Sequence, residues 1–235
     1  MKRKCLIVTG LPRGGTSMAA NLAHAMGIEM YKKASPPAPD VAHRYPYGDC
    51  EDTDFRKLCW QFISGPPADS ELDGCKYFNR HWRSALEHDE RELLFDWLET
   101  RIFQAPQCFG VKLPGLTCMV KPLVDLLRSE GVTPYMLFVD RNVADASYSL
   151  AKKRGQRYSP DDPVAWATAV QHFNVWMLGK AHRYAYNARV PVMNFGFQEM
   201  LAPQSSCARR LAEFLDVPMR ETADDVIVRE LHSVG

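Results

Sequence analysis

A short glycine-rich segment, Gly10 to Ser17, carries the residue types best suited to holding an anion. Two glycines stand five positions apart and a serine follows two positions later, which is the spacing of a phosphate-binding loop. Glycines let the backbone wrap an anion with its amides pointing inward, and the helix that follows adds partial positive charge. Arg13 adds a fixed cation, and Thr16 and Ser17 add hydroxyl donors. The alternative is an ordinary glycine turn in which Thr16 or Ser17 is a helix N-cap.

Thr16 occupies the position at which such a loop usually carries a lysine. In enzymes that use nucleoside triphosphates, that lysine contacts the β- and γ-phosphates, and Mg²⁺ neutralises their charge. A threonine in its place indicates a ligand of lower negative charge at the loop, such as a 5′-phosphosulfate.

A second group of candidate binding residues follows the apolar segment 134–139. Arg141 comes just after this predicted strand, at the edge of the sheet where ligands bind in open α/β folds. Asp145 and Ser149 follow at steps of four, so the three residues lie along one stripe of the predicted helix 142–154. Arg141 and Ser149 could hold a second anion. Alternatively, Arg141 pairs with Asp145 and Ser149 is merely exposed.

These candidate residues lie at junctions between predicted strands and predicted helices. Apolar segments typical of buried strands alternate with segments whose apolar residues recur at helical spacing. This alternation predicts an α/β fold of the P-loop type, a three-layer α/β/α arrangement with a central, mostly parallel sheet. No repeat or linker divides the chain, so residues 1–235 are predicted to form a single domain. The predicted strands cover 5–9, 108–111, 134–139 and 190–195, and the predicted helices cover 16–26, 54–64, 82–103, 118–129, 142–154, 163–188 and 204–215.

Composition argues against several classes of partner. Hydrophobic residues make up 46% of the 235 residues, enough for a sizeable core, while a net charge of +1 gives no general attraction to nucleic acid or to a membrane surface. The apolar run after Lys4 is shorter than the roughly 7–15 residues of a signal peptide, and no segment approaches the about 18 residues that span a bilayer. The seven cysteines are scattered without metal-binding spacing, as is typical of reduced thiols. We therefore expect a cytoplasmic protein without a membrane anchor or a metal site.

The segment Pro12–Ser17 resembles the first signature of the PAPS-dependent sulfotransferases, bacterial type, where PAPS is 3′-phosphoadenylyl sulfate. That signature reads Pro, Lys or Arg, any residue, Gly, Thr, and then Ser or Thr. The resemblance implies that Arg13 stabilises the bridging oxygen as it leaves, and that the 5′-phosphosulfate of the donor is held by Arg13, Gly14, Gly15, Thr16 and Ser17.

The segment 137–141, together with Ser149, resembles the second signature of this family. In the family, a strand, an arginine and a serine eight residues later bind the 3′-phosphate of the donor. The resemblance therefore implies that Arg141 and Ser149 bind that phosphate.

Two further residues match less specific features of the family. Gly110 to Pro114 falls where bacterial sulfotransferases carry G-x-K-x-P, which implies that Lys112 lies near the sulfuryl group; the alternative is a solvated lysine at a strand end. Glu51 lies in a segment like the G-x-x-E-D of bacterial relatives and could accept a proton from the acceptor. The alternative is that Asp52 or Thr53 caps a helix with acidic residues in its first turn. His43 is a second candidate for the base.

The chain departs from the cytosolic animal members of the family. Their catalytic histidine, two residues after the lysine, is replaced by Pro114, and their C-terminal R-K-G segment is missing. The base must therefore lie elsewhere, or be unnecessary for an acceptor that ionises easily.

The resemblance implies transfer of a sulfuryl group from PAPS to a hydroxyl or amine of a small-molecule or carbohydrate acceptor. Adenosine 3′,5′-bisphosphate (PAP) would be the product, no metal would be required, and Arg13, Glu51 and Lys112 would be catalytic. The loop 28–53 and the region from Trp60 to Trp82 are expected to line the acceptor pocket. Two alternatives stay open, a P-loop kinase that binds ATP with Mg²⁺ and a nucleotide-binding protein without catalysis. The oligomeric state is left open.

Overall fold

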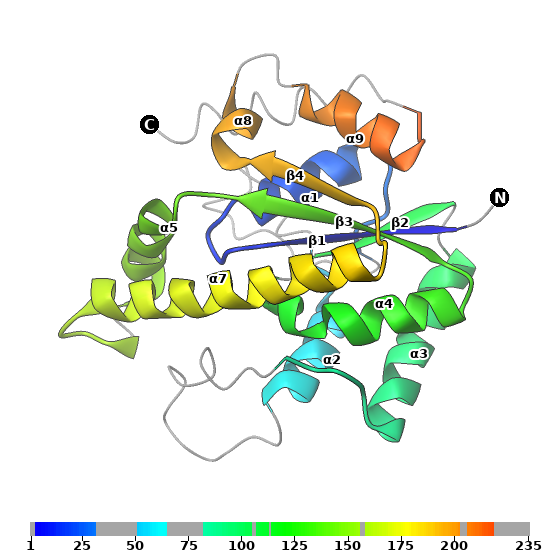
Figure 1. Ribbon diagram of the computed structural model, residues 1–235, viewed down its shortest axis with the longest axis horizontal. Helices are drawn as coiled ribbons and strands as arrows, with labels where there is room; N and C mark the ends of the chain where they lie inside the picture. Colours follow the sequence, from blue (N-terminus) through cyan, green and yellow to red (C-terminus); the bar gives the residue numbers. More distant parts are fainter. Residues whose placement is uncertain are drawn as a thin grey trace.

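A computed structural model describes residues 3–31, 51–64, 82–104, 107–112, 114–155, 158–202 and 206–218. Its centre is a sheet of four parallel strands in the order β2-β1-β3-β4 (Figure 1). In the registers, Lys4 lies opposite both Cys108 and Thr133, and Met136 lies opposite Val192. The strands are β1 (Lys4–Gly10), β2 (Cys108–Lys112), β3 (Thr133–Asp140) and β4 (Val192–Gly196).

Helices connect the strands and form two layers around the sheet. In Figure 1, α1, α8 and α9 lie on one side of the sheet, while α2, α3, α4 and α7 lie on the other. The bounds are α1 (Thr16–Ala25), α2 (Thr53–Ser64), α3 (His88–Gln104), α4 (Val120–Ser129), α5 (Val143–Leu150), α7 (Pro163–Asn187), α8 (Phe197–Leu201) and α9 (Cys207–Leu215). A 3₁₀ segment, η2 (Pro114–Met119), precedes α4, and a π-helical segment, η3 (Ala151–Gly155), follows α5.

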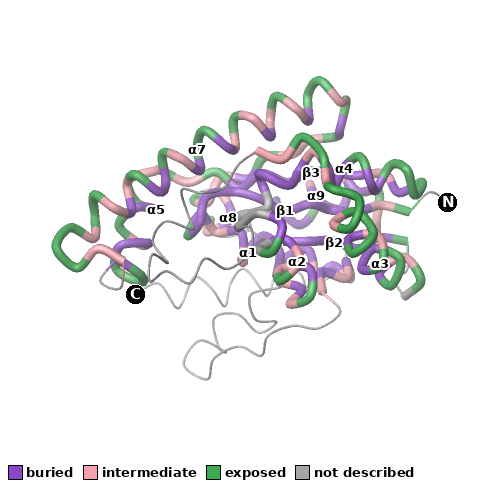
Figure 2. The backbone as a smooth tube through the Cα atoms, turned by 90° about the horizontal axis from the view of Figure 1, so that it is seen from below, coloured by how far each residue is buried: buried purple, intermediate pink, exposed green. Residues whose placement is uncertain are grey.

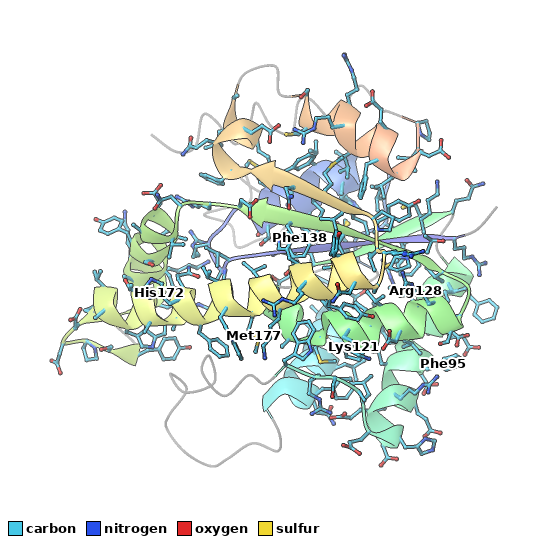
Figure 3. All side chains as sticks on the ribbon, in the orientation of Figure 1. Phe95, Lys121, Arg128, Phe138, His172 and Met177 are labelled. Carbon is cyan, nitrogen blue, oxygen red and sulfur yellow. The ribbon has the colours of Figure 1, made fainter. Side chains whose placement is uncertain are left out.

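The core is split in two by the sheet because side chains alternate between its faces. In β1, Cys5 and Ile7 pack with α2, α3, α4 and α7, whereas Leu6 and Val8 pack with α1 and α9. Figure 2 shows the resulting pattern, with buried residues along the strands and exposed ones on the outer surface of α7. The side chain of Phe138 in β3 lies between the sheet and α7, where it stacks on His182 (Figure 3). The predicted α/β fold with helices on both faces of a parallel sheet is confirmed.

The elements differ from the predicted ones mainly at their ends. The predicted helix 82–103 begins only at His88, where α3 starts, and the predicted helix 142–154 becomes π-helical after Leu150. Pro122 is tolerated because it lies in the first turn of α4, where its missing N–H would have no helical partner anyway. The short α8 was not predicted, since five residues are too few for a helical pattern to be recognised.

Five cysteines lie in the described ranges, and each is buried and forms no disulfide: Cys5, Cys59, Cys108, Cys118 and Cys207. Burial raises the pKa of the Cys108 thiol to about 11, and burial also raises the pKa of Cys59 well above its ordinary value. These thiols are therefore kept in their unreactive protonated form. In the part of the chain that the structure describes, no helix combines the length and the apolar character needed to cross a membrane.

Candidate functional site: a glycine-rich loop with three cations

The glycine-rich loop joins the carboxyl end of β1 to the first turn of α1, as predicted. Gly15 occupies the N-cap position with a φ of 96°, and no side chain caps this helix end among the described residues. The amides of the first helical turn have no intrahelical acceptor and therefore stay available to a ligand. Together with the helix dipole, they make this end of α1 suitable for an anion.

Gly10 and Gly15 are required by the close packing of this loop against neighbouring elements. A Cβ on Gly10 would lie 2.6 Å from the Val139 carbonyl oxygen of the neighbouring strand. A Cβ on Gly15 would lie 2.5 Å from Cδ2 of Phe197, at a φ that L-residues rarely adopt. The loop therefore lies directly against β3 and α8, at the carboxyl edge of the sheet.

Arg13 is constrained by its backbone conformation and by hydrogen bonds to the carbonyls on both sides of its Cα. Its φ of 64° falls in the left-handed region, which is uncommon for residues other than glycine. Hydrogen bonds hold the two successive carbonyls of this segment: Nε2 of Gln171 donates to Pro12 O at 2.7 Å, and Nη1 of Arg141 donates to Arg13 O at 2.8 Å. The backbone on both sides of the Arg13 Cα is thus fixed from α7 and from the end of β3.

The two predicted phosphate motifs lie side by side. Nε of Arg13 donates to Oγ of Ser149 at 3.2 Å, in addition to the contact of Arg141 with the loop backbone. The Arg141 guanidinium lies over the ring of Phe197, 4.0 Å from its centre, which orients its planar fork. Asn142 caps α5 by accepting from the amides of Ala144 and Asp145, so Ser149 faces the loop from the second turn of a defined helix.

Lys112 and Glu51 meet on the other side of the loop. Nζ of Lys112 donates to Ser17 Oγ at 3.0 Å and to Glu51 Oε1 at 2.7 Å, and the lysine side chain is only 2% exposed. Lys112 is therefore a buried cation at the end of β2, and the alternative of a solvated lysine at this strand end is wrong. Asp52 is the residue that caps α2, since its Oδ1 accepts from the amides of Asp54 and Phe55 at 3.1 Å each. Glu51 is left to face Lys112, with Arg56 at 3.5 Å from its other oxygen.

Sequence reasoning missed two residues of this site, Gln171 and Phe197. Phe197 belongs to α8, whose shortness hid it. Gln171 carried a usable signal, because it is polar at a position where the predicted helix 163–188 has its apolar stripe, beside Ala167 and Val170. A polar side chain on a buried face needs a hydrogen-bond partner, and here that partner is the loop.

Several residues predicted to line an acceptor pocket lie outside the described residues. These are the segments 32–50, which includes His43, and 65–81. At their borders, Tyr31 stacks on His24 and Trp82 packs edge-on against Tyr184. Among the residues that the structure describes, no group of three or more His, Cys, Asp or Glu side chains is arranged to hold a metal ion.

Chemically, the arrangement combines free helix amides, two hydroxyls and three cations around one short loop. Arg13 and Arg141 are fixed guanidinium groups suited to oxyanions, whereas Lys112 is a point charge paired with a carboxylate. Such a site can bind a ligand with two anionic groups and stabilise charge that grows on one of them.

Comparison with known proteins identifies neighbours by fold. No protein-family model and no curated protein matches this chain. Among solved structures, the chain is similar to the sulfotransferase STF9 from Mycobacterium avium, with a TM-score of 0.56 and 14% identity over 99% of this chain and 68% of the other. It is also similar to the sulfotransferase domain from the curacin biosynthetic pathway, with a TM-score of 0.52 and 14% identity over 95% of this chain and 77% of the other. The chain therefore has the fold of bacterial sulfotransferases, as the two signatures implied.

Proposed function

We propose that this protein is a sulfotransferase that takes a sulfuryl group from PAPS and transfers it to a hydroxyl or amine. The observation that carries the proposal is the contact of the two signatures, because Arg13 donates to Ser149 while Arg141 donates to the backbone of Arg13. A donor with phosphates at both its 5′ and 3′ positions matches two adjoining anion sites of this kind. The fold shared with two bacterial sulfotransferases supports the same conclusion.

In this proposal, the loop and the first turn of α1 bind the 5′-phosphosulfate through backbone amides and through the hydroxyls of Thr16 and Ser17. Arg141 and Ser149 bind the 3′-phosphate. Much of the rate then comes from positioning, since both ends of the donor are held before the acceptor arrives.

Each predicted catalytic residue has one role in the proposed transfer step. The acceptor oxygen or nitrogen forms a bond to sulfur while the bond from sulfur to the bridging oxygen breaks, and PAP leaves with that electron pair. Arg13 and Lys112 stabilise the charge that grows on the leaving phosphate. The acceptor proton passes to the Glu51 carboxylate, a contribution worth roughly 10²–10⁴-fold in rate.

The hydroxyl of Ser17 disfavours the kinase alternative. In P-loop kinases, the hydroxyl at this position holds Mg²⁺. Here the ammonium of Lys112 donates to Ser17 Oγ at 3.0 Å. A cation already fixed at that hydroxyl repels a divalent metal ion.

The acceptor is proposed as a small molecule or carbohydrate, and no nucleic acid or membrane partner is proposed. The cysteines in the described ranges are buried and form no disulfide, which fits a reducing compartment, and we propose the cytoplasm.

Calorimetric titration with PAP, and with ATP plus Mg²⁺ in parallel, tests the donor assignment. We expect tight binding of PAP and weak binding of ATP; the reverse would refute the proposal in favour of a kinase. Arg141→Ala should weaken binding of PAP more than binding of adenosine 5′-phosphate, because only PAP carries the 3′-phosphate. Arg91→Ala, on the exposed surface of α3, is the matched control and should change neither.

Catalysis is tested separately from binding. Hydrolysis of PAPS, or turnover of an acceptor, should be measurable with the wild-type protein and lost in Arg13→Ala. Tight PAP binding without any turnover would instead favour a nucleotide-binding protein that does no chemistry.

A further inference from the structure

Gln171 is a buried polar side chain that connects α7 to the anion-binding loop. It is 0% exposed and lies on the buried stripe of α7, beside Ala167 and Val170. Its Nε2 donates to the carbonyl oxygen of Pro12 at 2.7 Å, across 159 positions of sequence. The transfer chemistry proposed above assigns no role to this contact.

The neighbouring amide on the same stripe behaves differently. Asn174, one turn further along α7, donates from Nδ2 to Val170 O of its own helix at 2.7 Å. Gln171 instead reaches out of its helix, and its Oε1 has no hydrogen-bond partner among the described residues. Because an unpartnered buried oxygen costs free energy, an apolar side chain would serve packing better at this position. The glutamine is therefore better explained by what it does for the loop.

The contact determines the direction of a peptide unit in the loop. The peptide bonds of the described residues are trans, so the N–H and C=O of one unit point in opposite directions. With the Pro12 carbonyl held toward α7, the amide N–H of Arg13 must point away from α7. Arg13 itself has a φ of 64°, a conformation that persists only where surrounding contacts enforce it. Gln171 on the preceding carbonyl and Arg141 on the following one supply those contacts.

We propose that Gln171 is a positioning residue that keeps the Pro12–Arg13 segment in its binding conformation, so that the loop is organised before the 5′-phosphate of the donor arrives. The proposal rests on the proposed function, because it names the ligand group that the loop receives. It predicts that Gln171 affects binding of the 5′-phosphate and leaves binding of the 3′-phosphate intact.

The test compares two ligands on two matched variants. Gln171→Met removes the amide at similar size, while Asn174→Leu removes the neighbouring buried amide that does not touch the loop. Calorimetry measures the affinity for PAP and for adenosine 3′-phosphate, which lacks the 5′-phosphate, and thermal melting measures stability. We expect Gln171→Met to weaken the affinity for PAP by about tenfold or more, and tenfold is equivalent to about 1.4 kcal/mol of binding free energy. The same variant should weaken the affinity for adenosine 3′-phosphate by less than about twofold. Asn174→Leu should lower the melting temperature yet leave the ratio of the two affinities at the wild-type value.

Each outcome separates this inference from the proposed function. If the wild-type protein binds PAP and Gln171→Met weakens both ligands equally, or weakens neither, the role of Gln171 is wrong and the donor assignment stands. If the wild-type protein does not bind PAP, both are wrong. Should Gln171→Met fail to fold, Gln171→Asn tests the same contact, since it keeps the amide but is one methylene too short to reach Pro12. A wild-type affinity ratio in that variant would also overturn the inference.

Discussion

Replacing one partner of the ion pair between Lys112 and Glu51 is predicted to cost more stability than replacing the other. The Lys112 side chain is 2% exposed and that of Glu51 is 14% exposed, with 2.7 Å between Nζ and Oε1. At an effective dielectric constant of about 20, the attraction at this distance is about 6 kcal/mol. Burying each ion costs several kcal/mol of lost hydration, so the intact pair contributes little net stability. When one partner is removed, the other remains buried without the attraction that offset its lost hydration, and the protein is destabilised.

Glu51→Gln should therefore be the more damaging single substitution. It leaves the ammonium of Lys112 buried with the Ser17 hydroxyl but without its carboxylate, which should cost about 3–5 kcal/mol of unfolding free energy. Lys112→Met leaves Glu51 partly exposed and still 3.5 Å from Arg56, so its cost should be about 1–2 kcal/mol, near that of an ordinary substitution. The double variant should cost less than the sum of the singles by about 2 kcal/mol.

Urea unfolding of the wild type and the three variants, followed by circular dichroism, measures their free energies of unfolding and hence the interaction energy of the pair. An interaction energy within about 0.5 kcal/mol of zero would mean that the two side chains act independently. A larger loss for Lys112→Met than for Glu51→Gln would contradict the burial argument directly. In the same proteins, Glu51→Gln should lower the rate of sulfuryl transfer by roughly 10²–10⁴-fold if its carboxylate accepts the acceptor proton.

Two further predictions concern the loop and α7. Gly15→Ala should destabilise the protein by about 2–4 kcal/mol and weaken the binding of PAP, because the new Cβ clashes with Phe197 and the residue is strained at a positive φ. Gly131→Ala, whose Cβ would meet nothing within 4 Å, should show only the strain of about 1 kcal/mol; equal losses in the two variants would rule out the clash. Burial lowers the pKa of His182 below its ordinary 6.5, so the unfolded chain binds the proton more readily and stability should fall as pH drops through 6.5 and below. His182→Phe keeps a ring on Phe138 but cannot titrate, so melting temperatures between pH 8 and 5 should fall less steeply in this variant; parallel curves would contradict the assignment.

Much of the fold could be predicted because its signals are local. The strand 134–139 is a continuous apolar run, and β3 covers Thr133–Asp140; the loop Gly10–Ser17 lies between a strand and a helix as its glycine spacing required. The errors in the predicted bounds lie at the ends of elements, where capping and local bending determine the residue at which a helix begins or ends. The end of α5 illustrates this, since no feature of Lys152 or Lys153 indicated that the helix would become π-helical after Leu150.

Most members of the candidate site could be predicted, although Gln171 and Phe197 were missed, but the contacts between them could not. Residue types and spacing were enough to select Arg13, Lys112 and Arg141. They could not show that Lys112 reaches Ser17 across 95 positions and Glu51 across 61, or that Glu51 rather than Asp52 is left over after α2 is capped.

The sequence alone therefore determined the order of the strands and of the longer helices, and the types of group suited to an anion. Both depend on patterns within a few turns of chain, which propensity and spacing encode. Only the tertiary structure decided that Gln171 holds Pro12, that Arg13 meets Ser149, and that Lys112 is buried against a carboxylate. Those pairings arise because parallel strands bring their carboxyl ends to one edge of a sheet, and α7 then crosses beneath that edge. No local pattern specifies which distant side chains will meet there.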